Sequence, residues 1–144
     1  MGGALRVWRR RLLIACAAGL AIAGVWSSAA VAGSPYTVAV EAVPNTVPLN
    51  GMLKVTASGN SSNLSRLEVF VNKKVPCRPT AAGDSAVATD LMLIKTAVVH
   101  AYTKTHGVKA VNAGNHFACA YLTSVPPPSP TLLRARASAP YTVG

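Results

Sequence analysis

Two cysteines carry the best-defined chemistry in this sequence. Of the three cysteines, Cys16 lies in an apolar N-terminal stretch, which leaves Cys77 and Cys119 in the rest of the chain. In an oxidising compartment, two thiols have a single possible pairing within one chain. We therefore predict a Cys77–Cys119 disulfide, which in the chain-entropy picture stabilises a domain by about 4 kcal/mol.

Acid/base and nucleophilic chemistry have few candidates here. The four carboxylates fall on separate predicted elements: Glu41, Glu68, Asp84 and Asp90. A general acid/base pair needs two carboxyl groups that face one another, and Glu41 and Glu68 fall on the polar faces of their predicted strands. No G-x-S-x-G nucleophile motif occurs. We predict no catalytic residues and no enzyme activity.

The histidines are the candidates for a metal site. His100, His106 and His116 are the three histidines, and no compact pattern such as H-E-x-x-H or paired C-x-x-C occurs. If His100 and His106 lay on neighbouring strands, their imidazoles would approach each other. Isolated surface histidines explain the same spacing. We therefore predict no metal and no other cofactor, and an extracytoplasmic metal-binding domain is kept as an alternative function.

The N-terminal residues have the order of a secretory signal peptide. Arg6 and residues 9–11 form a basic region, residues 12–25 are apolar, and residues 30–32 are Ala-Val-Ala. A signal peptidase recognises this succession of a basic segment, an apolar segment and an A-x-A site. We predict a signal helix within residues 1–32, cleavage between Ala32 and Gly33, and a secreted or envelope-associated product.

Two features of the leader leave alternatives open. Residues 12–32 make 21 residues, enough to cross a bilayer as an uncleaved helix. The chain would then be a single-pass membrane protein, and we expect contact with a membrane only in that case. The arginines at 9–11, followed by Leu12 and Leu13, also fit a twin-arginine signal, so the export route stays undecided.

The charge balance restricts the class of partner. The chain has a formal net charge of +10, and loss of the four leader arginines leaves +6. The lysines are dispersed and no basic stripe alternates with aromatic residues, which argues against nucleic-acid binding. A moderate positive charge favours an anionic surface. We expect the partner to be an extracytoplasmic protein or an anionic envelope polymer.

Short alternating segments between residues 36 and 123 indicate the elements that position these groups. Alternation broken by turn residues is typical of antiparallel strands in a sandwich. Residues 80–93 differ, because their apolar residues are spaced as on a helix and Thr80 or Asp84 can cap its start. The predicted strands are residues 36–43, 52–58, 66–72, 97–103, 108–111 and 114–123, with turns at 59–63 and Gly107.

The strand at residues 114–123 is predicted to lie at the centre of the fold. Its sequence, GNHFACAYLT, is mostly apolar on both alternating faces. A strand that is covered on both sides belongs in the middle of a sheet in a layered structure. Cys77 follows the strand at 66–72 and does not lie on it. We therefore expect the disulfide to tie a connection to the central strand.

The C-terminal residues are predicted to lie outside the folded domain. Residues 125–130 are VPPPSP, a polyproline spacer that cannot donate the hydrogen bonds of a strand. No periodicity is recognised from there to Gly144, so we predict a disordered proline-rich tail. The predicted organisation is a signal peptide at 1–32, one β-sandwich at 34–124 and the tail at 125–144.

Together these features resemble small exported immunoglobulin-like proteins of high-GC, actinomycete-type bacteria. The resemblance rests on the leader, the strands MLKVTASG and RLEVFVN, the cysteine after the third strand and the ending HFACAYLTS. Phe117 stands two residues before Cys119, where such domains commonly carry a corner tyrosine. The resemblance implies an all-β, immunoglobulin-like antiparallel sandwich with one short inserted helix. It supplies no catalytic residues.

These observations predict a non-catalytic, exported immunoglobulin-like module. Its expected role is to bind a surface or to contribute to envelope structure. The alternatives are the metal-binding domain and the membrane protein with an uncleaved leader described above.

Overall fold

The computed structural model describes residues 34–73, 75–86, 91–125 and 131–144 of the chain. The predicted signal peptide, with its cleavage site at Ala32 and Gly33, lies outside the described residues. So do Asp90 and the prolines at 126–130. The elements in chain order are β1 (Tyr36–Val43), β2 (Thr46–Val47), β3 (Met52–Lys73), α1 (Ala81–Ser85), β4 (Leu91–Lys109), β5 (Gly114–Ser124) and β6 (Leu133–Val143).

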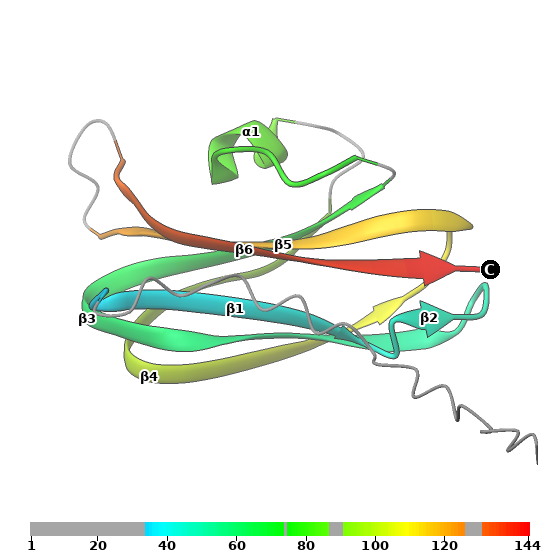
Figure 1. Cartoon of the computed structure of the whole chain (residues 1–144), viewed down its shortest axis with the longest axis horizontal. Helices are drawn as coiled ribbons and strands as arrows, with labels where there is room; N and C mark the ends of the chain where they lie inside the picture. The colour runs from blue at the N-terminus through cyan, green and yellow to red at the C-terminus, as the bar shows by residue number, and fades with distance from the viewer. Residues whose placement is uncertain (1–33, 74, 87–90, 126–130) are drawn as a thin grey trace, which may run out of the picture.

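The strands form two layers that face each other (Figure 1). In the first layer, the N-terminal half of β3 lies between β1 and the C-terminal half of β4. In the second layer, the C-terminal half of β3 lies between the N-terminal half of β4 and β5, and β6 follows β5. After the cis Val43–Pro44 peptide, β2 joins the second layer by pairing in parallel with β6.

β3 and β4 each continue from one layer into the other, at the left of Figure 1. The sequence predicted a turn over residues 59–63 between two strands, whereas the structure has one strand that bends there. The register shifts between Ser61 and Ser65, whose buried hydroxyls lie 2.6 Å apart. Small residues whose side chains bond to one another and to the backbone allow the strand to bend without leaving buried polar groups unpaired.

The region from Leu91 to Lys109 corrects two further predictions. β4 is one strand there, so Gly107 lies inside a strand and is not a turn. Among the described residues of the helix predicted over 80–93, only Ala81–Ser85 are helical, whereas Leu91 and Ile94 pair with β3. The prediction of Thr80 as the N-cap is confirmed, since its side chain accepts a hydrogen bond from the backbone N–H of Gly83 at 3.2 Å.

β6 corrects the prediction that the tail from residue 125 is disordered. Leu133–Val143 is a strand that pairs with β5 along its length, so the sandwich extends beyond residue 124. Its inward side is formed by alternate small and apolar residues, among them Ala137, Tyr141 and Val143. Alanine has a low strand propensity, which is why this alternation is a weak signal in the sequence.

The main core fills the space between the two layers and draws on every strand. Valines and leucines of β1, β3 and β4 meet the inward residues of β5 and β6. Its completely buried members are Val55, Ala57, Leu67, Val69, Ala118, Ala120 and Leu122. Two packed antiparallel layers with strands that change layer define an all-β, immunoglobulin-like sandwich with one short inserted helix, as predicted.

Candidate functional site

A second, smaller cluster covers the opposite face of β5, away from the main core. Phe70 of β3 and Cys119 and Tyr121 of β5 are buried there beneath Ala81 of α1. The rings of Phe70 and Tyr121 meet edge to face, with centroids 6.1 Å apart. α1 lies above this side of the second layer in Figure 1. We call this side the outer face. The prediction that β5 is covered on both sides is confirmed.

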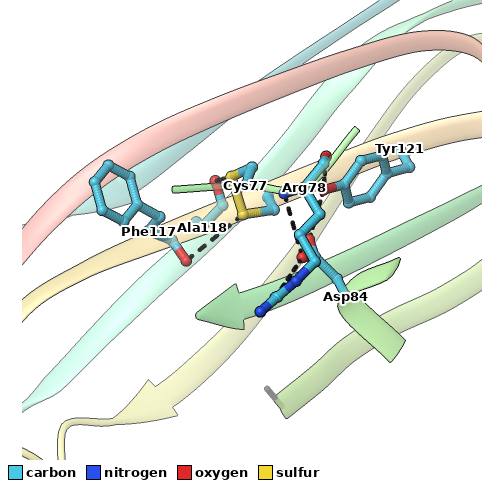
Figure 2. The surroundings of a disulfide bond; sticks show 7 residues. Cys77, Arg78, Asp84, Phe117, Ala118 and Tyr121 are labelled. Atoms are coloured by element: carbon cyan, nitrogen blue, oxygen red, sulfur yellow. Dashed lines mark hydrogen bonds and ion pairs between the residues drawn. A yellow bond between two sulfur atoms is a disulfide. The ribbon is translucent and has the colours of Figure 1, made fainter. Parts of the chain in front are cut away.

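The predicted disulfide is present at the outer face. Cys77 and Cys119 are bonded, with their Cα atoms 5.5 Å apart (Figure 2). Cys119 is completely buried on β5, whereas Cys77 is half-buried in the connection between β3 and α1. The bridge therefore ties a connection to the central strand, as predicted, and it does not join the two layers. Residues 76–86, which contain α1, form what we call the pinned segment.

Polar contacts fix the pinned segment a second time (Figure 2). Asp84 of α1 has no exposed surface, and its Oδ1 accepts from Nη1 of Arg78 at 3.1 Å. The hydroxyl of Tyr121 lies 2.5 Å from the other carboxylate oxygen of Asp84 and 2.6 Å from the carbonyl oxygen of Arg78. A buried carboxylate is tolerated only where it is paired and hydrogen-bonded, and this one is both.

The raised pKa of the Tyr121 hydroxyl fits its role as a hydrogen-bond donor that holds the structure together. Burial raises the pKa of its hydroxyl far above the ordinary value, and the hydrogen bond to Asp84 raises it further. The hydroxyl therefore keeps its proton at neutral pH and shares it between two acceptors. Phe117, at the position of the corner tyrosine, has no hydroxyl. Tyr121, two residues after Cys119, provides the bond back to the chain in its place.

A groove of about 440 Å³ opens beside α1 on the outer face. Its walls come from α1, from β3 and β5, and from the start of β6. It is lined by Arg66, Glu68, Thr80, Ala81, Ala82, Ser85, Thr123, Thr131 and Leu133. The cross-strand pair Arg66 and Thr123 lies in its wall, and the register places Glu68 on the same face, opposite Tyr121. This volume is within the range of about 300–1,000 Å³ that small-molecule sites occupy.

The structure separates the histidines. His100 and His106 lie on the same strand, β4, and not on neighbouring strands, and six residues of strand span about 20 Å. His116 is buried on β5, where its ring stacks on Tyr141 at 5.1 Å and its Nε2 lies 2.8 Å from the carbonyl oxygen of Asn112. Within the described residues, no three His, Cys, Asp or Glu side chains form a group that could hold a metal ion.

The described carboxylates do not form an acid/base pair with one another. Glu68 pairs with Lys95 at 3.7 Å on the outer face, and Glu41 is exposed on β1 in the first layer. Asp84 is buried in its pair with Arg78. In the parts of the chain that the structure describes, no helix has the length and hydropathy of a membrane span.

Sequence reasoning missed the partnership of Arg78, Asp84 and Tyr121. It treated Asp84 as a possible helix cap and gave Arg78 and Tyr121 no role. A usable signal was present, because a tyrosine in a strand covered on both sides must find a partner for its hydroxyl. The sequence did not show which residue that partner would be, since Tyr121 and Asp84 are 37 residues apart.

Comparison with known proteins gives structural likenesses only. No family model and no curated protein matches this chain. The CARDB domain of a Pyrococcus furiosus protein, in complex with di-metal ions, aligns at 10% identity with a TM-score of 0.43, over 75% of this chain and 91% of that one. An alkylpurine DNA glycosylase of Pseudomonas fluorescens, bound to DNA containing an abasic site analogue, aligns at 10% identity with a TM-score of 0.47.

That second alignment covers 77% of this chain and 31% of the glycosylase. A β-glucosidase of Listeria innocua in complex with glucose aligns at 13% identity and a TM-score of 0.38, over 76% of this chain and 16% of the enzyme. All three TM-scores lie below 0.5, so no property of these proteins is carried over to this chain.

Proposed function

We propose that this chain is an exported, non-catalytic immunoglobulin-like module that binds a component of the cell envelope through its outer face. The observation that carries the proposal is the double fixation of the pinned segment, by the Cys77–Cys119 disulfide and by the contacts of Asp84. A surface whose shape is fixed before binding loses little conformational entropy when a partner arrives.

The state of Asp84 supports a structural role over a catalytic one. Its carboxylate has no exposed surface, and both oxygens accept hydrogen bonds from groups of the protein. A general acid or base must come within hydrogen-bond reach of a substrate. Here the pinned segment itself occupies the space around the carboxylate, which favours binding on the surrounding surface over chemistry at Asp84.

Export is supported by the disulfide together with the predicted leader. Structural disulfides persist in oxidising compartments and are rare where thiols are kept reduced. The charge of +6 expected after removal of the leader favours an anionic envelope polymer as the partner, and an extracytoplasmic protein is the alternative.

Co-sedimentation with isolated cell envelopes tests this proposal. The protein purified from a bacterium that exports it should sediment with the envelopes. A Cys77→Ala/Cys119→Ala variant, in which the pinned segment loses its covalent tie, should bind several-fold more weakly. Lys104→Gln changes an exposed charge of the first layer and should have no effect. Absence of sedimentation would overturn the proposal, and equal weakening by Lys104→Gln would remove the outer face from it.

A further inference from the structure

We propose that the groove beside α1 binds an acidic sugar unit, with Arg66 holding the carboxylate and the surrounding hydroxyl side chains holding the ring hydroxyls. This inference rests on the proposed function, because it names the ligand chemistry of the same binding module. The observations that support it are the chemical types of the side chains that line the groove, their burial, and the hydrogen bonds and ion pairs that they make.

Arg66 provides the charge that selects an acid. Arg66 is half-buried and lines the groove, and among the described residues its side chain makes no hydrogen bond and no ion pair. Two other arginines of this layer are engaged: Arg78 with Asp84, and Arg134 with Ser65 at 2.6 Å. An arginine carries five N–H donors in a planar fork that matches a carboxylate. No described residue therefore occupies the donors of the Arg66 side chain.

Several hydroxyl side chains line the same groove as Arg66 and suit a ligand that itself carries hydroxyls. Thr123 is only 6% exposed, and its hydroxyl makes a single long contact, at 3.4 Å, with the carbonyl oxygen of Arg66. Thr80, Ser85 and Thr131 line the same groove. Each hydroxyl can donate one hydrogen bond and accept others, as each hydroxyl of a sugar can. The methyl groups of Ala82 and Leu133 provide apolar contact for the C–H face of a sugar ring.

The carboxylate of Glu68 favours a sugar acid over a simple anion as the ligand of the groove. Its side chain is 14% exposed, and its nearest cation, Lys95, lies at 3.7 Å and is 55% exposed. This carboxylate accepts hydrogen bonds and has no proton to donate when ionised. It repels an anion placed beside it but accepts hydrogen bonds from ring hydroxyls, so it favours a ligand whose charge lies at Arg66 and whose hydroxyls lie at Glu68. The groove thus combines one free cation among its described residues, one acceptor and several hydroxyls, which is the complement of a uronic acid.

NMR titration of the ¹⁵N-labelled purified protein tests the assignment. The probes are D-glucuronate, D-glucose and inorganic phosphate, each added at constant ionic strength so that screening does not change. Glucuronate should give saturable amide shifts at Arg66, Ala82, Thr123 and Leu133. Glucose should bind the same residues about tenfold more weakly, because a charge-assisted hydrogen bond contributes on the order of one power of ten in affinity.

Two arginine variants form the matched pair for this test. Arg66→Gln should weaken glucuronate binding about tenfold and leave glucose binding unchanged. Arg136→Gln should alter neither, because Arg136 lies across the outer face, in a separate hollow next to Cys77 and Phe117. Since Arg66 makes no side-chain hydrogen bond or ion pair among the described residues, its replacement should leave the fold intact, and the amide spectrum reports this directly.

Four outcomes overturn the inference. They are phosphate or glucose shifting these amides as strongly as glucuronate does, equal weakening by the two arginine variants, and the absence of saturable shifts in the groove. If any of these occurs while the unmodified protein still sediments with envelopes, the groove assignment fails and the proposed function stands. If sedimentation also fails, both are wrong.

Discussion

The hydroxyl of Tyr121 lies 2.5 Å from Oδ2 of Asp84, a residue 37 positions earlier in the chain. This contact joins the centre of β5 to the only helix among the described residues. The same hydroxyl reaches the carbonyl oxygen of Arg78 at 2.6 Å, one residue after the half-buried cysteine of the disulfide. One tyrosine and one cysteine of β5 thus hold the pinned segment from neighbouring positions on the outer face.

Removing the hydroxyl of Tyr121 should cost more than removing that of another buried tyrosine. Tyr121→Phe leaves a buried carboxylate short of a donor, and we expect a loss of about 2–3 kcal/mol in the free energy of unfolding. Tyr102→Phe is the matched control, because that hydroxyl donates only to the carbonyl of Thr37, at 2.8 Å, and should cost about 1 kcal/mol. Urea unfolding measures both, and equal losses would show that the bond to Asp84 adds nothing.

The two ion pairs of the outer face should differ in their contribution to stability. Arg78→Gln removes the cation from a completely buried carboxylate and should destabilise the protein by about 3 kcal/mol. Lys95→Gln breaks a longer pair in which the lysine is 55% exposed, so its cost should stay below about 1 kcal/mol. Chemical denaturation of the two variants tests this order, and the reverse order would refute the structural role given to Asp84.

Two strand glycines provide a test of the packing of the first layer. A Cβ at Gly59 would overlap the carbonyl oxygen of Thr37 and lie 2.8 Å from the hydroxyl of Tyr102. Gly59→Ala should therefore cost about 2 kcal/mol, by forcing β1 away from β3. At Gly107 the nearest atom, Cε of Met52, is 3.5 Å away, so Gly107→Ala should change stability by less than about 0.5 kcal/mol. Similar thermal midpoints for the two variants would contradict this.

Stability should decline at alkaline pH. Burial raises the pKa of Tyr102 and of Tyr141 from 10.0 to about 12. A raised pKa in the folded state means that the unfolded chain loses its proton first. The stabilisation is therefore complete below about pH 10 and is lost as the pH rises towards about 12, by up to about 1.4 kcal/mol per pH unit for each tyrosine.

Urea midpoints measured from neutral to alkaline pH test this dependence. Tyr102→Phe should reduce the alkaline decline but not abolish it, because Tyr121 and Tyr141 also have raised pKa values in the folded protein. An unchanged slope in that variant would show that the hydroxyl of Tyr102 titrates normally in the folded protein.

The sequence predicted β5 and the disulfide correctly, because β5 is recognised from the pattern of one short segment and the disulfide from the number of cysteines. A strand that is apolar on both faces must be covered on both sides, and two remaining cysteines have one pairing. The bends in β3 and β4 were missed, since a polar run such as residues 59–63 is equally compatible with a turn between strands and with a bent strand. β6 was missed because alanines form much of its inward alternation.

The candidate site was harder to predict than the fold. Its members come from β3, the pinned segment, β5 and the start of β6, and no local pattern links Arg66 to Thr131. Asp84 was expected at a helix terminus, and its burial depends on where the disulfide places α1 on the sheet. Such contacts arise from tertiary packing, which the spacing of residues along the chain does not encode.

Intact mass spectrometry of the protein from the culture fluid and envelopes of its native host distinguishes an exported, disulfide-bonded module from a membrane-anchored chain. We expect a chain that begins at Gly33 and gains about two daltons on reduction, as one disulfide requires. A full-length chain found only in membranes, or a mass unchanged by reduction, would contradict an exported module whose binding face is held in place by the Cys77–Cys119 bond.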